Sequence, residues 1–455
     1  MKGLYRTGMC FERVSTRVST YNNWSSPNLQ GEESKRPRTV RIERDRRMLQ
    51  VMFNGELDSV SITTTVERQM DNNSNITGSV RENDKQRKLI LHFDIRNTVI
   101  VADSITNVSV EQALNSFLTG VTWGKESDDG RWVWYSDKLS LTPPSEDTIT
   151  YYKHLEKMLV KTPSDRAKLR LQTGDFTQSE IGKNFLPYFN QHMNLLRWTH
   201  EYEQKNECLT MKGIDGQPYH YLLPAIYKCI HKLYMDNRDF AIVFRTYGLD
   251  AENVIASLAH GLEGNHPGFN KRVAISVNRT PGFIHRSDGQ CIKCEIRGNE
   301  DSKDLLQTYT GDRDVYNVLS QCNGILGFKD DFVYWQNNQY HHTAGKPLFI
   351  DPFDCNVHHI FFDDNIRTFE DDNIVDVRLF ETKGAKTARS LSKVEAASFE
   401  NVCMVQADLI ESIESDEYYT AAVDRCEQNY SKYLMKWHGI SRGLSLNGIH
   451  NFGAV

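Results

Sequence analysis

Three apolar runs of the sequence end on polar residues whose side chains can take part in chemistry. Asp94 follows the run LILHF, Thr246 ends FAIVFRT, and the pair Asp363 and Asp364 ends HHIFFDD. Burying an ionised carboxylate without a partner is costly, so an acid at such a position usually has a partner, a metal or a catalytic task. One carboxylate together with an acidic pair forms a hard oxygen environment that suits Mg²⁺, which favours substrates bearing phosphate. The hydroxyl of Thr246 can donate a hydrogen bond to a phosphate oxygen.

These residues need a sheet that holds them together. The central part of the chain alternates short apolar runs with longer helical patterns, which predicts a parallel sheet flanked by helices. The clearest unit is the amphipathic pattern Leu222–Asn237, which runs into the strand Phe240–Gly248 and is followed at once by a second helical pattern, ENVIASLAHGLEG. A helix is also predicted from Ser109, where Gln112 completes a capping box. All strands of a parallel sheet end at one edge, so the polar residues at the three strand ends are expected to meet there.

The same segments resemble the four motifs of the haloacid dehalogenase-like (HAD) superfamily. Its first motif is an apolar strand followed by Asp-x-Asp-x-Thr, and DIRNT at Asp94 matches the first aspartate and the threonine. Its second motif, an apolar strand ending in serine or threonine, is similar to AIVFRTYG at Thr246. Its third motif contributes a lysine, for which Lys346 in AGKPLFID is the better match and Lys329 the weaker one. Its fourth motif, a strand with a terminal acidic pair, is similar to HHIFFDDN, and the four occur in the family's order over about residues 86–385.

The resemblance implies a fold and a reaction. The fold is α/β, with a Rossmann-like parallel sheet flanked by helices. The reaction is Mg²⁺-dependent phosphoryl transfer, as a phosphohydrolase or phosphotransferase, in which Asp94 is the nucleophile and becomes an aspartyl-phosphate. The implied site comprises Asp94, Asp363 and Asp364 with the backbone carbonyl of Arg96 for the metal, and Thr246 and the catalytic Lys346 for the phosphate. The expected substrate is a phosphorylated small molecule or protein.

Arg96 departs from the family pattern. Phosphatases of the family carry a second aspartate two positions after the nucleophile, and in this chain arginine stands there. That carboxylate protonates the leaving oxygen and later activates water, a role typically worth about 10² to 10⁴ in rate, whereas arginine stays protonated and can do neither. Two hypotheses follow. Either Arg96 binds an anionic group of the substrate in a modified reaction, or the chain is a catalytically impaired member that has kept the fold and binds a partner or a phosphorylated ligand.

Composition and periodicity, together with what the resemblance implies for the core and the cap, predict how the chain divides. The expected segments are a disordered arm (1–45), a β-rich N-terminal segment (46–85), a HAD-like core (86–120 and 221–385) with a further insertion at about 264–310, a helical cap insertion (121–220) and C-terminal helices (386–455). Within the cap, a long helix is predicted from Thr177, with Glu180 at the capping-box position and tolerance or a kink at Pro187.

Charge and composition limit the kinds of partner that can be expected. The 455 residues carry a net charge of −6 that is spread through the sequence, so neither nucleic acid nor a membrane is expected as the main partner. No stretch approaches the roughly 18 apolar residues of a membrane helix, and nine cysteines in no evident framework predict a reducing compartment, the cytoplasm or the nucleus. The basic stretch 35–47 is the exception, because it can contact nucleic acid or act as a localisation signal. A nucleic-acid-associated protein with the α/β body as scaffold is therefore an alternative of a different class.

Two cysteines raise the question of a second metal site. Cys291 and Cys294 have the spacing of half a zinc site, but the sequence contains no second Cys-x-x-Cys pair. His341 and His342 can complete such a site only if the fold brings them close. The simpler interpretation is a hairpin with two free thiols.

Overall fold

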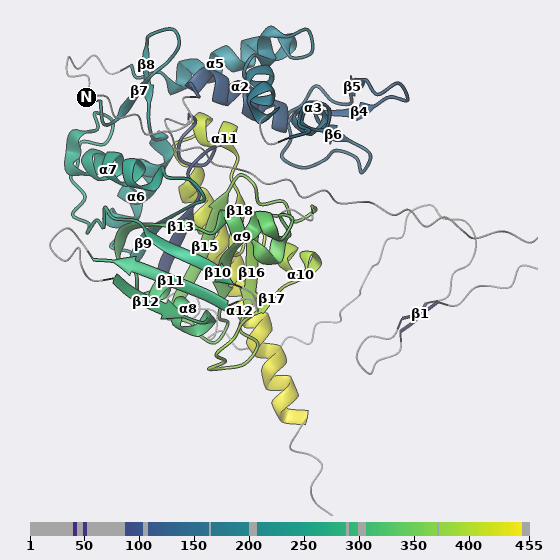
Figure 1. Ribbon diagram of the computed structural model, residues 1–455. Helices are drawn as coiled ribbons and strands as arrows, with labels where there is room; N and C mark the ends of the chain where they lie inside the picture. The colour runs from purple at the N-terminus through teal and green to yellow at the C-terminus, as the bar shows by residue number, and fades with distance from the viewer. Residues whose placement is uncertain are drawn as a thin grey trace, which may run out of the picture. The chain divides into compact units, whose positions relative to one another are not determined.

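The computed structural model describes residues 40–42, 49–51, 87–102, 108–162, 165–199, 207–287, 291–298, 306–370 and 373–447 (Figure 1). The chain forms two compact units, Met1–Asn72 and Asn73–Val455. In the first unit, β1 (Val40–Ile42) pairs antiparallel with β2 (Leu49–Val51). β1 falls within the segment predicted as a disordered arm. The rest of that arm, most of the basic stretch 35–47 and most of the predicted β-rich segment lie outside the described residues.

The second unit is built around an eight-stranded sheet (Figure 1). In spatial order its strands are β12 (Leu306–Thr310), β11 (Cys291–Arg297), β10 (Gly282–Ser287), β13 (Gly324–Asp330), β9 (Phe240–Thr246), β3 (Lys88–Phe93), β15 (Val357–Asp363) and β18 (Met404–Gln406). The six strands from β10 to β18 run parallel to one another, and β11 and β12 complete one edge in antiparallel pairing. This mixed but mostly parallel sheet confirms the predicted α/β class.

Among five of the parallel strands, the order in space runs against the order along the chain on one side of β3 and with it on the other. Counted along the chain, β3, β9, β13, β15 and β18 are the first to the fifth of this group, and they lie in the order third, second, first, fourth, fifth. The chain therefore leaves β3 toward one side of the sheet and later returns to the other side for β15. Connections that leave two neighbouring strands in opposite directions open a crevice at the carboxyl ends of those strands.

Helices cover both faces of the sheet. They are α6 (Pro224–Met235), α7 (Ala251–His260), α12 (Tyr418–Asn447) and α8 (Asp312–Gln321). α6, α7 and α12 share a hydrophobic core with Leu91, Phe93 and alternate residues of β9. α8 packs on the opposite face, in a core with Ile90 and Val243. Successive residues of a strand point to opposite faces, so β3 and β9 are apolar on both sides, as is typical of parallel strands buried between two layers.

A smaller sheet carries Lys346. Its strands are β14 (Lys346–Ile350), β16 (Val375–Leu379) and β17 (Arg389–Ser390), and β14 runs parallel to β16. Phe349 of β14 lies in the same hydrophobic core as α8 and Val243, so this sheet covers the face of the main sheet that α8 also covers. Lys346, the first residue of β14, is thereby brought against the main sheet.

The helices of the chain between β3 and α6 (Figure 1) pack in a separate hydrophobic cluster. Its helices are α2 (Val110–Gly120), α3 (Tyr151–Leu159), α4 (Arg166–Gly174) and α5 (Leu186–Leu196), joined by α11 (Leu409–Glu414). Beside them run β4 (Trp123–Glu126), β5 (Trp132–Trp134) and β6 (Ile149–Thr150), and a hairpin of β7 (Thr210–Lys212) and β8 (Pro218–His220). α2 has the predicted capping box of Ser109 and Gln112. Its buried residues belong to this cluster, although the sequence prediction placed it in the core segment 86–120.

The prediction of a long helix that starts at Thr177 is wrong. Short 3-10 turns occupy Phe176–Gln178 and Lys183–Phe185, and α5 begins only at Leu186. The backbone N–H and the hydroxyl of Thr177 both donate to Asn115 Oδ1, at 2.9 and 2.8 Å, so Thr177 is tied to α2 instead of capping a helix. Pro187 stands in the first turn of α5, where its missing N–H has no intrahelical partner to lose.

Two other segments also differ from expectation. The insertion predicted at about 264–310 supplies β10, β11 and β12, which widen the main sheet. The C-terminal segment predicted as helical contains β17, α10 (Lys393–Ala397), α11 and α12, but also β18 at the edge of the main sheet. The remaining elements are α9 (Phe332–Asn337), a π-helical turn at Gly261–Asn265 and a 3-10 turn at His342–Ala344. Among the described residues, no helix is both long enough and apolar enough to cross a membrane.

Candidate metal centre

The loop after β3 turns sharply, so that it buries the side chain of Ile95 and exposes that of Arg96. Asp94 continues the pairing of β3, because its backbone N–H donates to Phe362 O at 2.8 Å. The chain then turns through Asn97, whose φ of 55° lies in the left-handed region that asparagine tolerates better than most residues. Ile95 is fully buried by this turn and Arg96 is exposed. The turn therefore presents Asp94 and Arg96 on the open side of the sheet edge.

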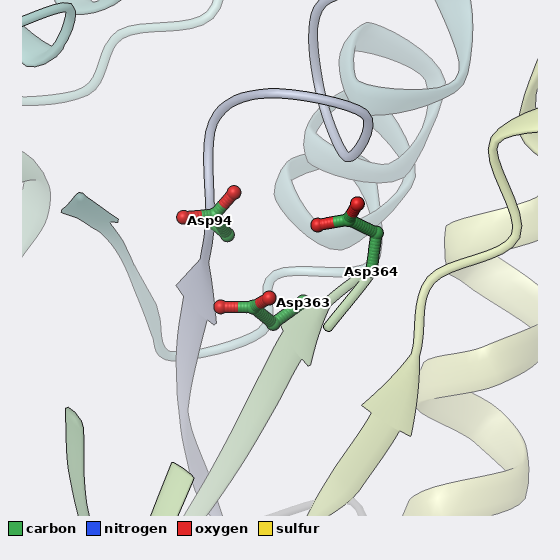
Figure 2. Close-up of side chains that lie close together, drawn as sticks. All are labelled: Asp94, Asp363 and Asp364. Atoms are coloured by element: carbon green, nitrogen blue, oxygen red, sulfur yellow. The ribbon is translucent and has the colours of Figure 1, made fainter. Parts of the chain in front are cut away.

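Three carboxylates converge at the ends of β3 and β15. Asp94 follows β3, Asp363 is the last residue of β15, and Asp364 is the next residue (Figure 2). One oxygen from each carboxylate lies within 4.8 Å of the others. Asp364 is held from both sides, by Nδ2 of Asn97 at 3.1 Å and by Nδ2 of Asn365 at 2.9 Å. The cluster thus forms in the crevice where the strand order reverses, the usual place for a ligand in an open α/β sheet.

Lys346 lies directly against this cluster. Its Nζ donates to Asp94 Oδ1 at 2.5 Å and to Asp363 Oδ2 at 2.8 Å, and also to the carbonyl oxygen of Arg245 at 3.2 Å. The side chains of Lys346 and Asp363 are fully buried, and that of Asp94 is 14% exposed. Within the described part of the chain, no ion pair joins Lys329 to these carboxylates. Of the two candidate lysines, Lys346 is the one the fold brings to Asp94.

The charges of the cluster are incompletely balanced. Burial raises the pKa of Asp94 to about 8; Lys346 opposes this rise, and the charges of Asp363 and Asp364 add to it. Burial also raises the pKa of Asp364 to about 6, with the charge of Asp363 as a further cause. A site with three carboxylates and one lysine therefore retains protons near neutral pH. Such a site gains most from a bound cation.

Thr246 ends β9, the strand next to β3. Its Oγ1 accepts a hydrogen bond from the backbone N–H of Gly248 at 2.9 Å, and its hydroxyl hydrogen remains able to donate. Thr246 and Asp94 line the same cavity. The structure therefore brings Asp94, Lys346, Asp363 and Asp364 into contact and places Thr246 at the wall above them.

A buried ion pair that sequence reasoning missed supports this edge of the sheet. Arg245, immediately before Thr246, donates from Nε to Asp330 Oδ2 at 2.8 Å and from Nη2 to Asp330 Oδ1 at 2.6 Å. Both side chains are almost completely buried. The signal in the sequence was an arginine inside the otherwise apolar run FAIVFRT. Since the carbonyl of Arg245 also accepts from Lys346, the pair fixes β9 and β13 beside the acidic cluster.

We expect the substitution Asp330→Asn to destabilise the protein by about 3 to 5 kcal/mol, because it leaves the guanidinium of Arg245 buried without a counter-charge. Chemical denaturation followed by circular dichroism measures this loss. Asp137→Asn, at an exposed position, is the matched control and should change the free energy of unfolding by less than about 0.5 kcal/mol. A loss below about 1 kcal/mol in Asp330→Asn would mean that Arg245 finds another partner or water.

A cavity of about 520 Å³ lies above the acidic cluster. Its lining includes Asp94, Arg96, Thr246 and Asp364, next to the ends of β3, β9 and β15, and residues of α2, α3, α4 and the segment after β15. The helical cluster between β3 and β9 therefore covers the site, in the place where the sequence predicts a cap. The side chain of Arg96 lines this cavity together with that of Asp94.

Of the cysteine pair proposed as half a metal site, the structure describes the side chain of Cys294, and that of Cys291 lies outside the described side chains. Cys294 is a free, buried thiol in β11, and burial raises its pKa to about 12. His342 begins a 3-10 turn and His341 is the N-cap residue before it, and their ring centroids are 4.3 Å apart. Among the described residues, the only group of three or more metal-binding side chains close enough to share an ion is Asp94, Asp363 and Asp364.

Comparison of the chain with models of protein families, with curated proteins and with solved structures found no match. The functional argument therefore starts from the geometry of the site.

Proposed function

We propose that the protein is a Mg²⁺-dependent phosphohydrolase or phosphotransferase with a HAD-like fold, and that it acts through an aspartyl-phosphate on Asp94. The observation that carries the proposal is the contact of one buried lysine, Lys346, with two carboxylates from different strands, Asp94 and Asp363. The position of these groups at the reversal of strand order supports the same assignment. The Rossmann-like strand order supports the proposed fold.

The residues of the cluster suit Mg²⁺. When all three carboxylates are ionised they carry three negative charges and Lys346 one positive charge, so a divalent cation would neutralise the remainder. Asp94, Asp363 and Asp364, with the backbone carbonyl of Arg96, would hold the ion through oxygen atoms, the ligands Mg²⁺ prefers. When bound, the ion would supply positive charge to the oxygens of the transferred phosphoryl group.

The side chains of this chain have separate tasks in the proposed reaction. One oxygen of Asp94 attacks phosphorus and forms the aspartyl-phosphate. Lys346 orients Asp94 and neutralises the charge that develops on the phosphoryl oxygens. The hydroxyl of Thr246 donates to one of those oxygens. The helices that cover the cavity shield these groups in part from water, which strengthens each of these interactions.

Mg²⁺ is expected to bind more tightly as the pH rises from about 6 to about 8, the values to which the pKa of Asp364 and that of Asp94 are raised. Below these values the carboxyls hold protons, which the cation must displace, so binding should release protons into the buffer. Calorimetric titration at several pH values, in buffers of different ionisation enthalpy, measures both effects. An affinity that does not change with pH would show that the cation binds elsewhere.

The test of the proposed function is turnover of a panel of phosphate compounds with and without Mg²⁺, comparing the natural protein with Asp94→Asn. Metal-dependent turnover that requires Asp94 supports the proposal. Arg96 favours one second hypothesis, an impaired protein that binds a phosphorylated ligand or partner without converting it. That hypothesis predicts Mg²⁺-dependent binding of phosphate compounds by a folded protein with no turnover of any of them.

A further inference from the structure

The cavity above the acidic cluster holds no evident donor of a proton to a departing alkoxide. Its described lining residues include no histidine, and Arg96 occupies the position beside Asp94. Glu156 is ion-paired with Arg166 at 3.1 Å, and Glu370 with Lys153. Asp364 accepts hydrogen bonds from two asparagine amides and is one of the three carboxylates proposed to hold Mg²⁺, so it does not act as the donor. An alkyl phosphate ester is hydrolysed slowly in such a site, because its leaving oxygen must be protonated as it departs.

The phenols of the cavity do not fill this role. Tyr152 and Tyr247 line the cavity, and burial raises the pKa of both. A general acid is most effective when its pKa lies near the working pH, so phenols whose pKa is raised are poor donors.

Cationic side chains dominate the outer wall of the same cavity. They are Arg96, Lys153, Arg166, Arg170 and Arg367. Glu370 pairs with both Lys153 and Arg367, and Glu156 pairs with Arg166, so five cations face two carboxylates and the group keeps a net positive charge. Arg96, in the loop after β3, and Arg170 of α4 are exposed. The region just beyond Asp94 is thus built to receive a further negative charge, in addition to the phosphoryl group held by Lys346 and Thr246.

We propose that the site acts on phosphoanhydrides, compounds in which the phosphoryl group transferred to Asp94 is bonded to a second phosphate. This inference rests on the phosphoryl-transfer function proposed above. An oxygen of the Asp94 carboxylate bonds to the terminal phosphorus, and the bond from that phosphorus to the bridging oxygen breaks. The bridging oxygen leaves with its electron pair as part of a phosphate, which is stable as an anion and needs no proton. Arg96 and Arg170 bind that phosphate.

The second step, hydrolysis of the aspartyl-phosphate, also needs no acid from the protein. Water attacks the phosphorus of the aspartyl-phosphate, the bond between phosphorus and the Asp94 oxygen breaks, and the carboxylate is restored. Both protons of the water stay on the released dihydrogen phosphate, which exchanges one with solvent according to pH. Since no carboxylate stands at position 96 to activate the water, this step is expected to be the slower one.

Apolar side chains line the part of the cavity next to the cationic wall. Phe117 of α2, Trp123 of β4 and Tyr152 of α3 belong to it. They provide room for an organic group on the departing phosphate. Inorganic pyrophosphate and a nucleoside diphosphate share the anhydride chemistry, and a comparison of the two distinguishes a bare from a substituted leaving phosphate.

The experiment compares four compounds with the full-length protein and Mg²⁺: glycerol 2-phosphate, inorganic pyrophosphate, ADP and acetyl phosphate. We expect kcat/KM for the better of the two phosphoanhydrides to exceed that for glycerol 2-phosphate by about 10² to 10⁴, the range typical of a missing general acid. Arg96→Ala should lower the anhydride value by about ten- to a hundredfold, the usual effect of losing a hydrogen bond to a charged group. Arg96→Asp should lower it too and raise turnover of glycerol 2-phosphate at least about tenfold. Lys138→Ala, exposed and outside the cavity, is the control.

Acetyl phosphate separates the two proposals, because its acetate leaves without a proton and without needing the cationic wall. Labelling of Asp94 by acetyl phosphate together with the anhydride preference supports both. Labelling by acetyl phosphate with equal or better turnover of glycerol 2-phosphate overturns the substrate class alone. A preference that survives unchanged in Arg96→Asp also overturns it. No labelling of Asp94 by any compound overturns the proposed function, and the substrate class with it.

Discussion

Replacing Asp94 by asparagine is expected to abolish turnover and phosphoenzyme formation, with a loss of at least about 10⁴-fold in kcat. The amide has nearly the shape of the carboxylate but cannot attack phosphorus. The protein should remain folded, because the substitution removes one of three mutually repelling carboxylates and leaves Lys346 paired with Asp363. Steady-state turnover and mass spectrometry of the acid-quenched protein measure the two losses.

The control for this substitution is Asp128→Asn, which makes the same chemical change at an exposed position outside the cavity. Thermal unfolding without Mg²⁺ shows whether Asp94→Asn is folded, and we expect its midpoint to equal or exceed that of the natural protein. Unchanged turnover in a folded Asp94→Asn protein would remove Asp94 as the nucleophile. Absence of turnover in both proteins, with Mg²⁺-dependent ligand binding retained, would favour the impaired binding protein.

Lys346→Met is expected both to stop phosphoryl transfer and to destabilise the metal-free protein by about 3 to 5 kcal/mol, because it leaves two buried carboxylates without their cation. Burial by itself would lower the pKa of Lys346, but the carboxylates of Asp363 and Asp94 raise it above its ordinary value. A raised pKa means that the lysine stays protonated, and stabilises the fold, throughout the range from about pH 5 to pH 9. In the variant the carboxyls can instead take up protons, so its deficit should be smaller at pH 5 than at pH 8.

Denaturation of Lys346→Met at these two pH values, with and without Mg²⁺, tests the role of the charge. Added Mg²⁺ should recover part of the lost stability at pH 8, since it supplies positive charge to the same oxygens. Lys329→Met is the matched control, because Lys329 was the other candidate in the sequence and has no ion pair with the cluster. A larger loss in Lys329→Met than in Lys346→Met would contradict the assignment of Lys346.

The local sequence pattern was sufficient to predict the strands that end in the side chains of the candidate site. The runs LILHF, FAIVFRT and HHIFFDD are apolar on both faces, and the structure contains them as β3, β9 and β15. The helix signals around them also appear, including the capping box at Ser109. Thr177 shows the limit of such signals, because its hydroxyl and backbone N–H bond to Asn115 in another helix and the predicted cap does not form.

The candidate site could be predicted in part. Strand direction alone places Asp94, Thr246 and the acidic pair at one edge of the sheet. The order of the motifs in the family that the sequence resembles adds Lys346. Neither could predict that Lys346 starts a strand of a different sheet, that β18 extends the main sheet, or that Arg245 is neutralised by Asp330. These features depend on residues from about 40 to 250 positions apart in the chain.

The sequence thus determines which side chains stand at strand ends, because burial and alternation are properties of a few neighbouring residues. The fold decides their chemistry. Asp94 has a raised pKa because it is buried and because β3 and β15 lie side by side, so that the carboxylates of Asp363 and Asp364 face it. Arg96 gains its proposed role only because α3, α4 and the segment after β15 place further cations around the same cavity. Desolvation and the Coulomb energy between charges depend on distance in space, and only the packed chain sets that distance.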